Sequence, residues 1–525
     1  MNFTFAGGDS ARAKADVLVI PVFDNELTDK KKQPAALASA DKKLKGLLLK
    51  TAAQEGFKGK GEQLLSLHTH GKLGAPRVLL VGLGARAKFS AEVLRLAMGR
   101  AVKTANRLRA KTVVVAVPVL RETEAGIRAV VEGFALGGYR FDKWRTTNKD
   151  EKNAPRVDKV TLALPDGVKK DKVLEAAVAL GRRVAEATNW ARDLVNEPAG
   201  ALTPTILADQ AKAMAADAGL KIEVLGRKDI EKLKMGMFLG VTQGSVEEPK
   251  LIHVSWVPED GEAAKRAPLA LVGKAITFDS GGLSLKTAEG MVDMKTDMAG
   301  SAAVLGAMRV IATLKPPFPV HAYMGACENM PSGTAYRPGD VLVSRLGKTV
   351  EITNTDAEGR LVLGDVLAWA NETKPAMIVD LATLTGACMI ALGNYIVGAF
   401  GDDDQAVWSV LEAARNAGEE LWRMPVTELQ RDALKSEIAD MKNAGERWGG
   451  AINAALFLKE FVGETPWVHL DIAGPSQSPK ERGYLGRGAT GVGVRTLVEL
   501  TRRRAMELEH AEKDAAVTAE IDAKR

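Results

Sequence analysis

The sequence contains few of the residues that a disulfide scaffold, a membrane span or a histidine-rich metal site would need. Its only two cysteines, Cys327 and Cys388, lie among apolar or small residues, which predicts buried thiols in a reducing compartment. No apolar run of about 18 residues occurs, so no membrane span is expected, and the N-terminal residues show no apolar signal segment. We therefore expect a cytoplasmic protein. Three histidines in or beside apolar runs are expected to be core residues: His253, His321 and His469.

The motifs of several common protein classes are also missing. Residues 82–87 resemble a dinucleotide-binding glycine motif, but no acidic residue lies between Glu92 and Glu122, where the ribose-binding carboxylate belongs. A second glycine-rich match at 486–491 follows a poor strand, and no GxSxG nucleophile elbow occurs. The net charge of +6 is small for 525 residues. Basic clusters therefore indicate a solvated surface, and nucleic acid stays only an alternative partner.

The length and the apolar pattern predict an α/β protein with two domains. We predict a smaller N-terminal α/β domain at 1–170, a linker helix at 171–195, a larger domain at 196–500 and a charged tail at 501–525. The charges of the tail balance, so we expect a solvated helix with a frayed end. The strands expected in the first domain are Val17–Phe23, Arg77–Gly82, Thr112–Pro118 and Lys159–Leu164.

Most of the unusual residue choices lie in two short motifs, and the first runs from Leu271 to Gly300. The apolar run 269–278 predicts a buried strand, which Lys274 interrupts. A buried lysine is costly unless it is paired or neutral. Asp279 follows at the end of the strand, and Lys286 lies on the next stretch. Asp297 precedes a helix pattern of small residues, and we expect it to cap that helix.

The second motif runs from Ile352 to Asp365 and contributes Asp356, Glu358 and Arg360. The residues singled out from the two motifs are three aspartates, one glutamate, two lysines and one arginine, and neither motif contains histidine or cysteine. Converging carboxylates repel one another unless cations neutralise them. A pair of divalent metals bridged by carboxylates does this well, and an oxygen-rich set favours Mn, Mg or Zn. A neutral lysine is also a possible ligand. The alternative is a structural ion-pair network.

These motifs resemble the leucine aminopeptidase family, also called the cytosol aminopeptidases. The family signature NTDAEGRL is unbroken at Asn354–Leu361, and its K-x4-D-x6-K-x10-D spacing is met from Lys274 to Asp297. Further family-like stretches include RDLVNEPAGALTP at 192–204 and DLATLTGACMIALG at 380–393. The resemblance covers residues 190–500 strongly and the first 170 residues weakly. It implies that the larger domain is a mixed-sheet dinuclear metallopeptidase domain.

The resemblance implies a role for each site residue, with two divalent ions, Mn or Zn, in each subunit. The ligands of the tighter ion would be Lys274, Asp279, Asp297 and Glu358. The ligands of the more exchangeable ion would be Asp279, Asp356 and Glu358. The catalytic pair would be Lys286 and Arg360. Substrate main chain would meet Thr383, Leu384 and Gly386, and the pocket for the first side chain would be lined by Met294 and Asn354.

The implied activity is a metal-dependent aminopeptidase that releases N-terminal residues, preferably leucine or other apolar residues, from peptides. A water bridging the two ions would attack the scissile carbonyl. Arg360 stays protonated, so it is not a general base. The resemblance implies that it holds a bicarbonate, which shuttles the proton. The family expectation for assembly is a homo-hexamer. One alternative is a DNA-binding architectural protein that retains the peptidase fold. Another is a metallophosphatase, which usually needs histidine ligands.

Overall fold

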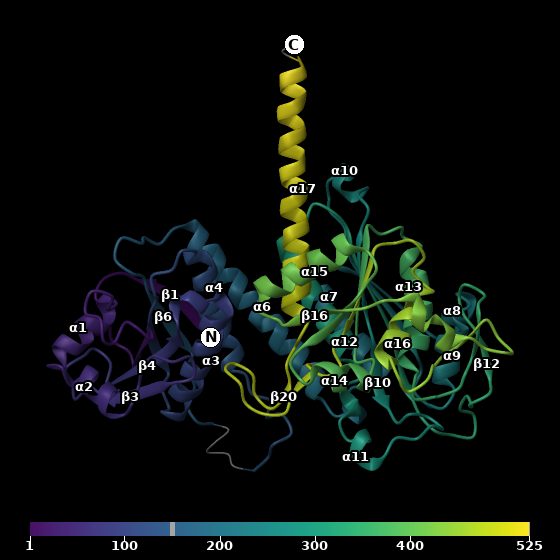
Figure 1. The fold of residues 1–525 in the computed structure, drawn as a ribbon, viewed down its shortest axis with the longest axis horizontal. Helices are drawn as coiled ribbons and strands as arrows, with labels where there is room; N and C mark the ends of the chain where they lie inside the picture. Colours follow the sequence, from purple (N-terminus) through teal and green to yellow (C-terminus); the bar gives the residue numbers. More distant parts are fainter. Residues whose placement is uncertain (148–152, 524–525) are drawn as a thin grey trace. The chain divides into compact units, whose positions relative to one another are not determined.

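The computed structural model describes residues 1–147 and 153–523 (Figure 1). The chain forms two compact units: Met1–Glu186 with Lys480–Arg487, and Ala187–Pro479 with Gly488–Arg525. One long helix, α6 (Lys172–Asn196), contributes residues to both units. Both units are α/β and the second is the larger, which confirms the predicted fold class.

The first unit is built on a six-stranded sheet in the order β1-β6-β5-β2-β4-β3. All neighbouring strands are parallel except the edge pair β3–β4, which is antiparallel. The four predicted strands are present, with end positions that differ by no more than two residues. The edge strands β1 and β3 were not predicted, because an edge strand with exposed side chains lacks a continuous apolar run. The strands are β1 Asn2–Ala6, β2 Val17–Phe23, β3 Leu64–His68, β4 Arg77–Gly84, β5 Thr112–Ala116 and β6 Lys159–Ala163.

Helices cover both faces of this sheet, because the side chains of its central strand alternate between two cores. Val17, Val19 and Phe23 of β2 pack in one cluster with α3 and α4. Leu18 and Ile20 pack in the other, with α1 and α2. The helices are α1 Ala35–Lys43, α2 Leu47–Gln54, α3 Ala91–Arg107 and α4 Thr123–Gly137.

The second unit is built on a mixed nine-stranded sheet. Eight strands follow the order β16-β15-β18-β14-β9-β11-β8-β7, and β10 pairs with β11 beyond the end of β9. The central strands β18, β14, β9 and β11 are parallel, so their carboxyl ends meet at one edge. Its strands are β7 Lys221–Leu225, β8 Lys250–Trp256, β9 Leu269–Gly273, β10 Ala275–Asp279, β11 Val320–Asn329, β14 Met377–Ala382, β15 Val397–Phe400, β16 Leu421–Met424 and β18 Trp467–Asp471.

Helices pack against this sheet, and short ladders lie beside it. The short strands are β12 Val341–Val343, β13 Thr349–Glu351, β17 Met441–Lys442, β19 Gln477–Ser478 and β20 Gly488–Ala489. The helices are α7 Pro204–Ala218, α8 Arg227–Lys232, α9 Gly236–Thr242, α10 Gly261–Ala264, α11 Ala288–Met291, α12 Ala299–Leu314, α13 Gly359–Asn371, α14 Gly386–Leu392, α15 Asp404–Ala417, α16 Gly450–Lys459 and α17 Val494–Ala523.

The single strand predicted at residues 269–278 is divided at Lys274 into β9 and β10. The amide of Lys274 donates to Leu381 O at 3.0 Å, and its carbonyl accepts from Ser301 N at 2.9 Å. The backbone of Lys274 is thus bonded to the end of β14 and to the first turn of α12. The break places the lysine side chain at the edge where the parallel strands end.

Among the described residues, one stretch is long and apolar enough to cross a membrane. It is Ala288–Leu314, which includes α12, and 83% of its most apolar window is buried inside the fold. Such burial is typical of a core helix. The cysteines are both buried and unpaired, as predicted.

Candidate metal centre

Six of the seven charged residues from the two sequence motifs meet at the edge where the central parallel strands end. Lys274 and Asp279 come from the divided strand, and Lys286 and Asp297 come from the chain that follows it. Asp356 and Glu358 come from the turn that precedes α13. Sites in open α/β sheets commonly lie outside the carboxyl ends of parallel strands, because successive loops converge there.

Lys274 is buried and binds two of the carboxylates. Its Nζ lies 2.8 Å from Asp297 Oδ2 and 2.8 Å from Glu358 Oε1. It also donates to the carbonyl of Thr383 at 3.0 Å. A glycine is required beside it, since a Cβ on Gly359 would lie 2.4 Å from Lys274 Cε. The first turn of α13 can therefore approach the lysine closely.

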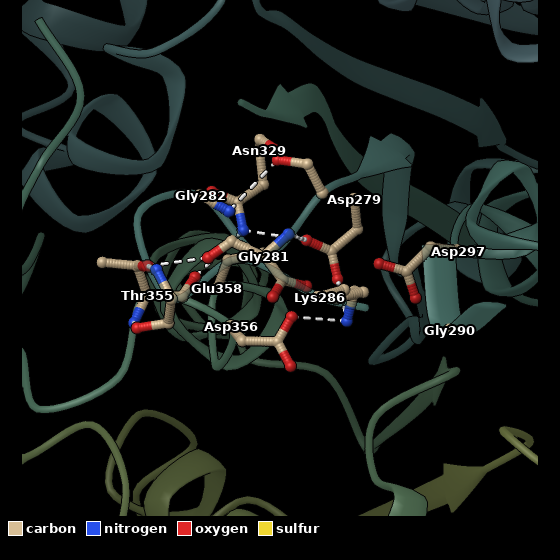
Figure 2. Close-up of polar contacts among 12 residues, drawn as sticks. Asp279, Gly281, Gly282, Lys286, Gly290, Asp297, Asn329, Thr355, Asp356 and Glu358 are labelled. Carbon is tan, nitrogen blue, oxygen red and sulfur yellow. Dashed lines mark hydrogen bonds and ion pairs between the residues drawn. The ribbon is translucent and has the colours of Figure 1, made fainter. Parts of the chain in front are cut away.

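Lys286 binds the other two carboxylates, and Figure 2 shows it between them. Its Nζ lies 2.8 Å from Asp279 Oδ2 and 2.5 Å from Asp356 Oδ1. The side chain is 17% exposed, in contrast to 4% for Lys274. Lys286 is therefore the lysine of the cluster that solvent reaches more readily.

Asp279 is oriented by hydrogen bonds from two neighbours. Its Oδ1 accepts from Gly281 N and from Asn329 Nδ2, both at 2.8 Å (Figure 2). The same Asn329 amide donates to the carbonyl of Thr355 at 2.9 Å, which joins the two motifs. Asn329 is fully buried at the end of β11, where it pairs in register with Asp279. It thus holds a carboxylate from one motif against the backbone of the other.

Asp297 does not cap α12, and that prediction was wrong. The N-cap residue is Met298, with no side-chain cap bond. The carboxylate of Asp297 is engaged elsewhere, because its Oδ1 accepts from Thr383 Oγ1 at 2.7 Å while Oδ2 faces Lys274. The side chain therefore belongs to the cluster of charges and not to the helix end.

The cluster carries more negative than positive charge. Four carboxylates face two lysines, so two negative charges stay uncompensated. Burial raises the pKa of Asp297 well above its usual range, and burial also raises the pKa of Asp279 and Asp356, with nearby carboxylates adding to each shift. Burial lowers the pKa of Lys274 and Lys286, but the adjacent carboxylates outweigh it and raise both. Both lysines are thus held in the charged form.

Several oxygen atoms of the cluster suit a divalent cation. Asp279, Asp356 and Glu358 each offer one carboxylate oxygen, and these oxygens lie within 4.8 Å of one another. Among the described residues, three buried carboxylate oxygens of the cluster have a lysine ammonium as their partner and no hydrogen bond besides: Asp297 Oδ2, Asp356 Oδ1 and Glu358 Oε1. Carboxylate oxygens in a cluster with excess negative charge are the donor set that hard divalent cations prefer. The residues therefore fit a metal.

Arg360 lies on the first turn of α13 and, within the described part of the chain, makes no ion pair or hydrogen bond with any of the four carboxylates. Its Nη1 donates to the carbonyl of Asn443 at 2.9 Å, while its Nε has no hydrogen-bond partner among the described residues. Burial lowers the pKa of its guanidinium to about 10, so the group remains charged at neutral pH. A buried cation with an unused donor is suited to binding a small anion.

The predicted substrate residues differ in their contacts and in their exposure. Thr383 bonds Asp297, and the amide of Leu384 donates to Asp471 Oδ1 at 3.2 Å. Gly386 is exposed at the start of α14, with open space where a Cβ would lie. The side-chain oxygen of Asn354 accepts from the amide of Asp356 at 2.9 Å, which fixes the turn that leads into Asp356. Met294 is half-buried just before Asp297.

None of the three histidines that lie in or beside apolar runs of the sequence is bonded to the cluster. His469 is buried and its Nδ1 lies 2.6 Å from Asp380 Oδ1, as expected of a core histidine. His253 and His321 are half-buried rather than core residues, and their ring nitrogens lie 2.9 Å apart. Burial lowers the pKa of His253 to about 4, so the pair is neutral at physiological pH.

Sequence reasoning assigned no role to Asn329, Asn443 or Asp471, although each contacts a predicted site residue or its backbone. It also assigned none to Thr355, whose carbonyl accepts from Asn329. Asn443 accepts from the amide of Thr353 and donates to the carbonyl of Asn354. A lone asparagine or threonine carries no spacing signal, because its partners are set by strand pairing rather than by distance along the chain. Strand register, which the sequence does not display, decides these contacts.

Comparison with protein families matches two models to this chain. The model described as cytosol aminopeptidase family, catalytic domain, matches residues 189–498. The model described as cytosol aminopeptidase family, N-terminal domain, matches residues 19–148.

Comparison with individual proteins gives long matches. A probable cytosol aminopeptidase of Solibacter usitatus is 46% identical over 503 residues, which cover 95% of this chain and 99% of that protein. A second, from Alkaliphilus metalliredigens, is 43% identical and covers 96% of this chain and 99% of that protein. Among solved structures, a mutant of tomato leucine aminopeptidase has a TM-score of 0.85 at 35% identity, covering 96% of this chain and 97% of that one. The bottromycin maturation enzyme BotP in complex with Mn has a TM-score of 0.81 at 35% identity, covering 94% of this chain and 100% of that one.

Proposed function

The chain belongs to the cytosol aminopeptidase family and is a metal-dependent leucyl aminopeptidase, and on that premise we propose that the carboxylate–lysine cluster is its catalytic centre. The observation that carries the proposal is the group of carboxylate oxygens from Asp279, Asp356 and Glu358 within 4.8 Å of one another. Their excess negative charge requires cations. We propose two divalent ions in each subunit, Mn or Zn, and the Mn complex of BotP is consistent with this choice.

The ligands divide into a buried and a more accessible set. In the proposal Lys274, Asp279, Asp297 and Glu358 hold the buried ion. Asp279, Asp356 and Glu358 hold the second ion, so Asp279 and Glu358 serve both. Asp356 supports this division, because its side chain is 33% exposed whereas those of Asp297 and Glu358 are 5% and 2% exposed. The more exposed ligand belongs to the ion that exchanges more readily.

Bound in this cluster, the ions would polarise a peptide carbonyl and lower the pKa of water. Lys286 is the protein group that we assign to the developing oxyanion. Its ammonium is at the accessible side of the cluster, and its neighbours hold it in the charged form. A donor fixed before the reaction stabilises a transition state more than a solvent molecule would.

Arg360 is assigned to binding a bicarbonate rather than to proton abstraction. A guanidinium that remains charged is a poor base. Its Nε has no hydrogen-bond partner among the described residues, and a planar anion offers two adjacent oxygens to such a group. The anion would accept the proton that the arginine itself is unable to accept.

The residues around the cluster are assigned to the substrate. Thr383, Leu384 and Gly386 lie on the loop after β14 and at the start of α14, where an exposed glycine leaves room for peptide main chain. Met294 and Asn354 would line the pocket for the first side chain. A flexible, polarisable methionine adapts to apolar side chains, which fits leucine better than aspartate.

The remaining proposals concern the whole chain. We propose the division into 1–170, 171–195, 196–500 and 501–525, a homo-hexamer and a cytoplasmic location, all on the family resemblance. The DNA-binding alternative has no support from these observations. Retention of the complete charged set favours catalysis instead.

The test compares the tripeptide Leu-Gly-Gly with its N-acetyl form at equal concentration, followed by mass spectrometry. A free α-amine can act as a ligand to the ions, whereas the nitrogen of an acetylated one is an amide nitrogen, whose lone pair is delocalised and does not bind a metal ion. We expect stepwise release from the free N-terminus and resistance of the acetylated peptide. Comparable rates, or internal fragments as first products, would show an endopeptidase or amidase instead.

A further inference from the structure

A cavity of about 450 Å³ lies in the first unit, and none of its lining residues belongs to the metal centre. It is lined by the segments that follow β1, β5 and β6, by Ile20 and Pro21 of β2, and by the first turn of α1. Cavities of about 300–1,000 Å³ are the size that holds small-molecule ligands.

The cavity lies where the order of the strands reverses. From β2 the chain goes to β3 and β4 on one side, and then crosses back to β5 and β6 on the other. In open α/β sheets, ligands bind in the crevice outside the carboxyl ends of the strands at such a switch point. The cavity occupies the β2–β5 switch point of this sheet.

β2 and β5 separate beside the cavity. β2 pairs with β5 only from Val17 to Val19, whereas its pairing with β4 continues through Pro21. Beyond β5 the chain follows β6 instead, because Val117 N donates to Ala163 O at 2.9 Å. The divergence opens the crevice and leaves an apolar floor that includes Ile20, Val117 and Leu164.

One hydroxyl among the lining residues has no protein partner. Ser10 lines the cavity, and its hydroxyl makes no hydrogen bond to any described residue. The hydroxyl is not among the fully enclosed side-chain atoms that lack a partner, so water reaches it through the cavity. The neighbouring Asp9 is already satisfied, since Ser39 Oγ donates to it at 2.9 Å and Lys43 Nζ lies at 2.5 Å. The hydroxyl of Ser10 is therefore available to a ligand.

At the mouth, Asp166 supplies an acceptor. It is exposed, lines the cavity and has no ion-pair or hydrogen-bond partner among the described residues. The cavity thus offers an apolar floor, a hydroxyl and a carboxylate, and no unpaired cation is among its described lining residues. This combination suits a neutral ligand with a flat apolar body and hydroxyl or amino donors, and it disfavours an anionic group.

We propose that this cavity is a second ligand site, which binds the nucleoside part of a nucleoside or nucleotide. The planar base lies on the apolar floor, and the ribose hydroxyls donate to Asp166, as ribose hydroxyls do to acidic residues in other α/β sheets. Ser10 bonds the ligand in the interior. A phosphate, where present, extends from the mouth, away from the carboxylates of Asp9 and Asp166.

The experiment is calorimetric titration of the full-length, metal-loaded protein with adenosine, AMP and leucine. We expect saturable binding of one adenosine per subunit and no tighter binding of AMP. Binding of AMP or leucine without binding of adenosine would overturn the proposal, as would the absence of adenosine binding.

Variants locate the site. Ala36→Trp fills the cavity from α1, and we expect it to weaken adenosine binding by more than about tenfold, or 1.4 kcal/mol. Ala38→Trp is the matched control, because Ala38 is exposed on the same helix and does not line the cavity. Ser10→Ala should weaken binding about fivefold, through one lost hydrogen bond. Peptidase activity should stay unchanged in all three.

Equal adenosine affinity in Ala36→Trp and the parent protein would place the ligand elsewhere and overturn the assignment. If the melting temperature of Ala36→Trp shows that the unit is damaged, Ala35→Trp replaces it, since Ala35 lies exposed at the rim of the cavity. The two variants leave the proposal testable in either case.

Discussion

Both units have a candidate site where their parallel strands end, but the two candidate sites differ in the residues that come after those strand ends. In the second unit, β10 ends at Asp279 and its neighbours add lysines and further carboxylates. In the first unit, β2 passes through Pro21 and β5 leads into Val117, so the corresponding crevice has an apolar floor. Strand order therefore sets where a site lies, whereas the residues after the strands set its chemistry.

The two sites also differ in what they require from a bound group. The metal centre has excess buried negative charge and carboxyl groups with raised pKa, so a cation stabilises it. The N-terminal crevice contains one carboxylate already paired to Lys43 and one exposed to water. The stability of the first unit should therefore not depend on added metal.

Removing a carboxylate from the metal centre should have the largest effect on activity, whereas removing one from the first unit should have none. Asp279→Ala removes an oxygen donor from the centre, so we expect loss of bound metal and of measurable peptide hydrolysis. Asp166→Ala, in the N-terminal crevice, is the matched control and should retain both. Metal content and turnover are measured on the same preparations. An active, metal-replete Asp279→Ala protein would remove that residue from the centre.

Removing the accessible lysine should reduce rate without removing metal. Lys286→Ala deletes the donor assigned to the oxyanion, and such donors are typically worth about 10²–10³ in kcat. Elemental analysis should still find both ions, in contrast to Asp279→Ala. Lys435→Ala, an exposed lysine paired with Asp432, serves as the control. Unchanged turnover in Lys286→Ala would exclude it from the mechanism.

The affinity for metal should increase with pH. The adjacent carboxylates raise the pKa of Lys274 above its usual range, so the metal-free protein holds this proton at neutral pH. Ligation needs the neutral amine, and binding must therefore release the proton, which predicts about tenfold tighter binding per pH unit for each proton released. Competition with a chelator at several pH values measures the slope. Lys274→Met should lower the slope, and an identical slope would show that the lysine is not a ligand.

The smallest effect is expected from the residue that orients Asp279. Asn329→Ala removes its hydrogen bonds to Asp279 and to the Thr355 carbonyl, which at about 1–1.5 kcal/mol reduces kcat/KM by about tenfold. The control is Asn371→Ala, since Asn371 bonds Thr465 away from the cluster. Equal activity of the two variants would mean that Asn329 has no positioning role.

Much of the fold could be predicted from apolar patterning, because fully buried strands such as β2 and β5 are continuous apolar runs. The edge strand β1 could not be predicted in this way, since its alternating exposed residues resemble those of a loop. Likewise the division of β9 from β10 depends on backbone bonds of Lys274 to Leu381 and Ser301, which lie far away in sequence.

The charged residues of the centre were recognisable because costly groups in an apolar context stand out. The ion pairs between them could not be predicted from the sequence. Lys274 reaches Asp297 and Glu358 only because the fold brings the strands and the turn before α13 together. The contribution of Asn329 depends on its register with Asp279 in the β10–β11 pair. The N-terminal crevice could not be predicted from the sequence either, since it arises where two strands diverge rather than from any motif.

The central claim is that peptide hydrolysis depends on metal held by the carboxylate–lysine cluster. The most direct measurement combines elemental analysis with leucyl-peptide hydrolysis on one preparation, before chelation, after exhaustive chelation and after reloading with Mn or Zn. We expect two ions per active subunit, no hydrolysis in the metal-free protein and recovery on reloading. Full activity in protein shown to be metal-free would contradict it.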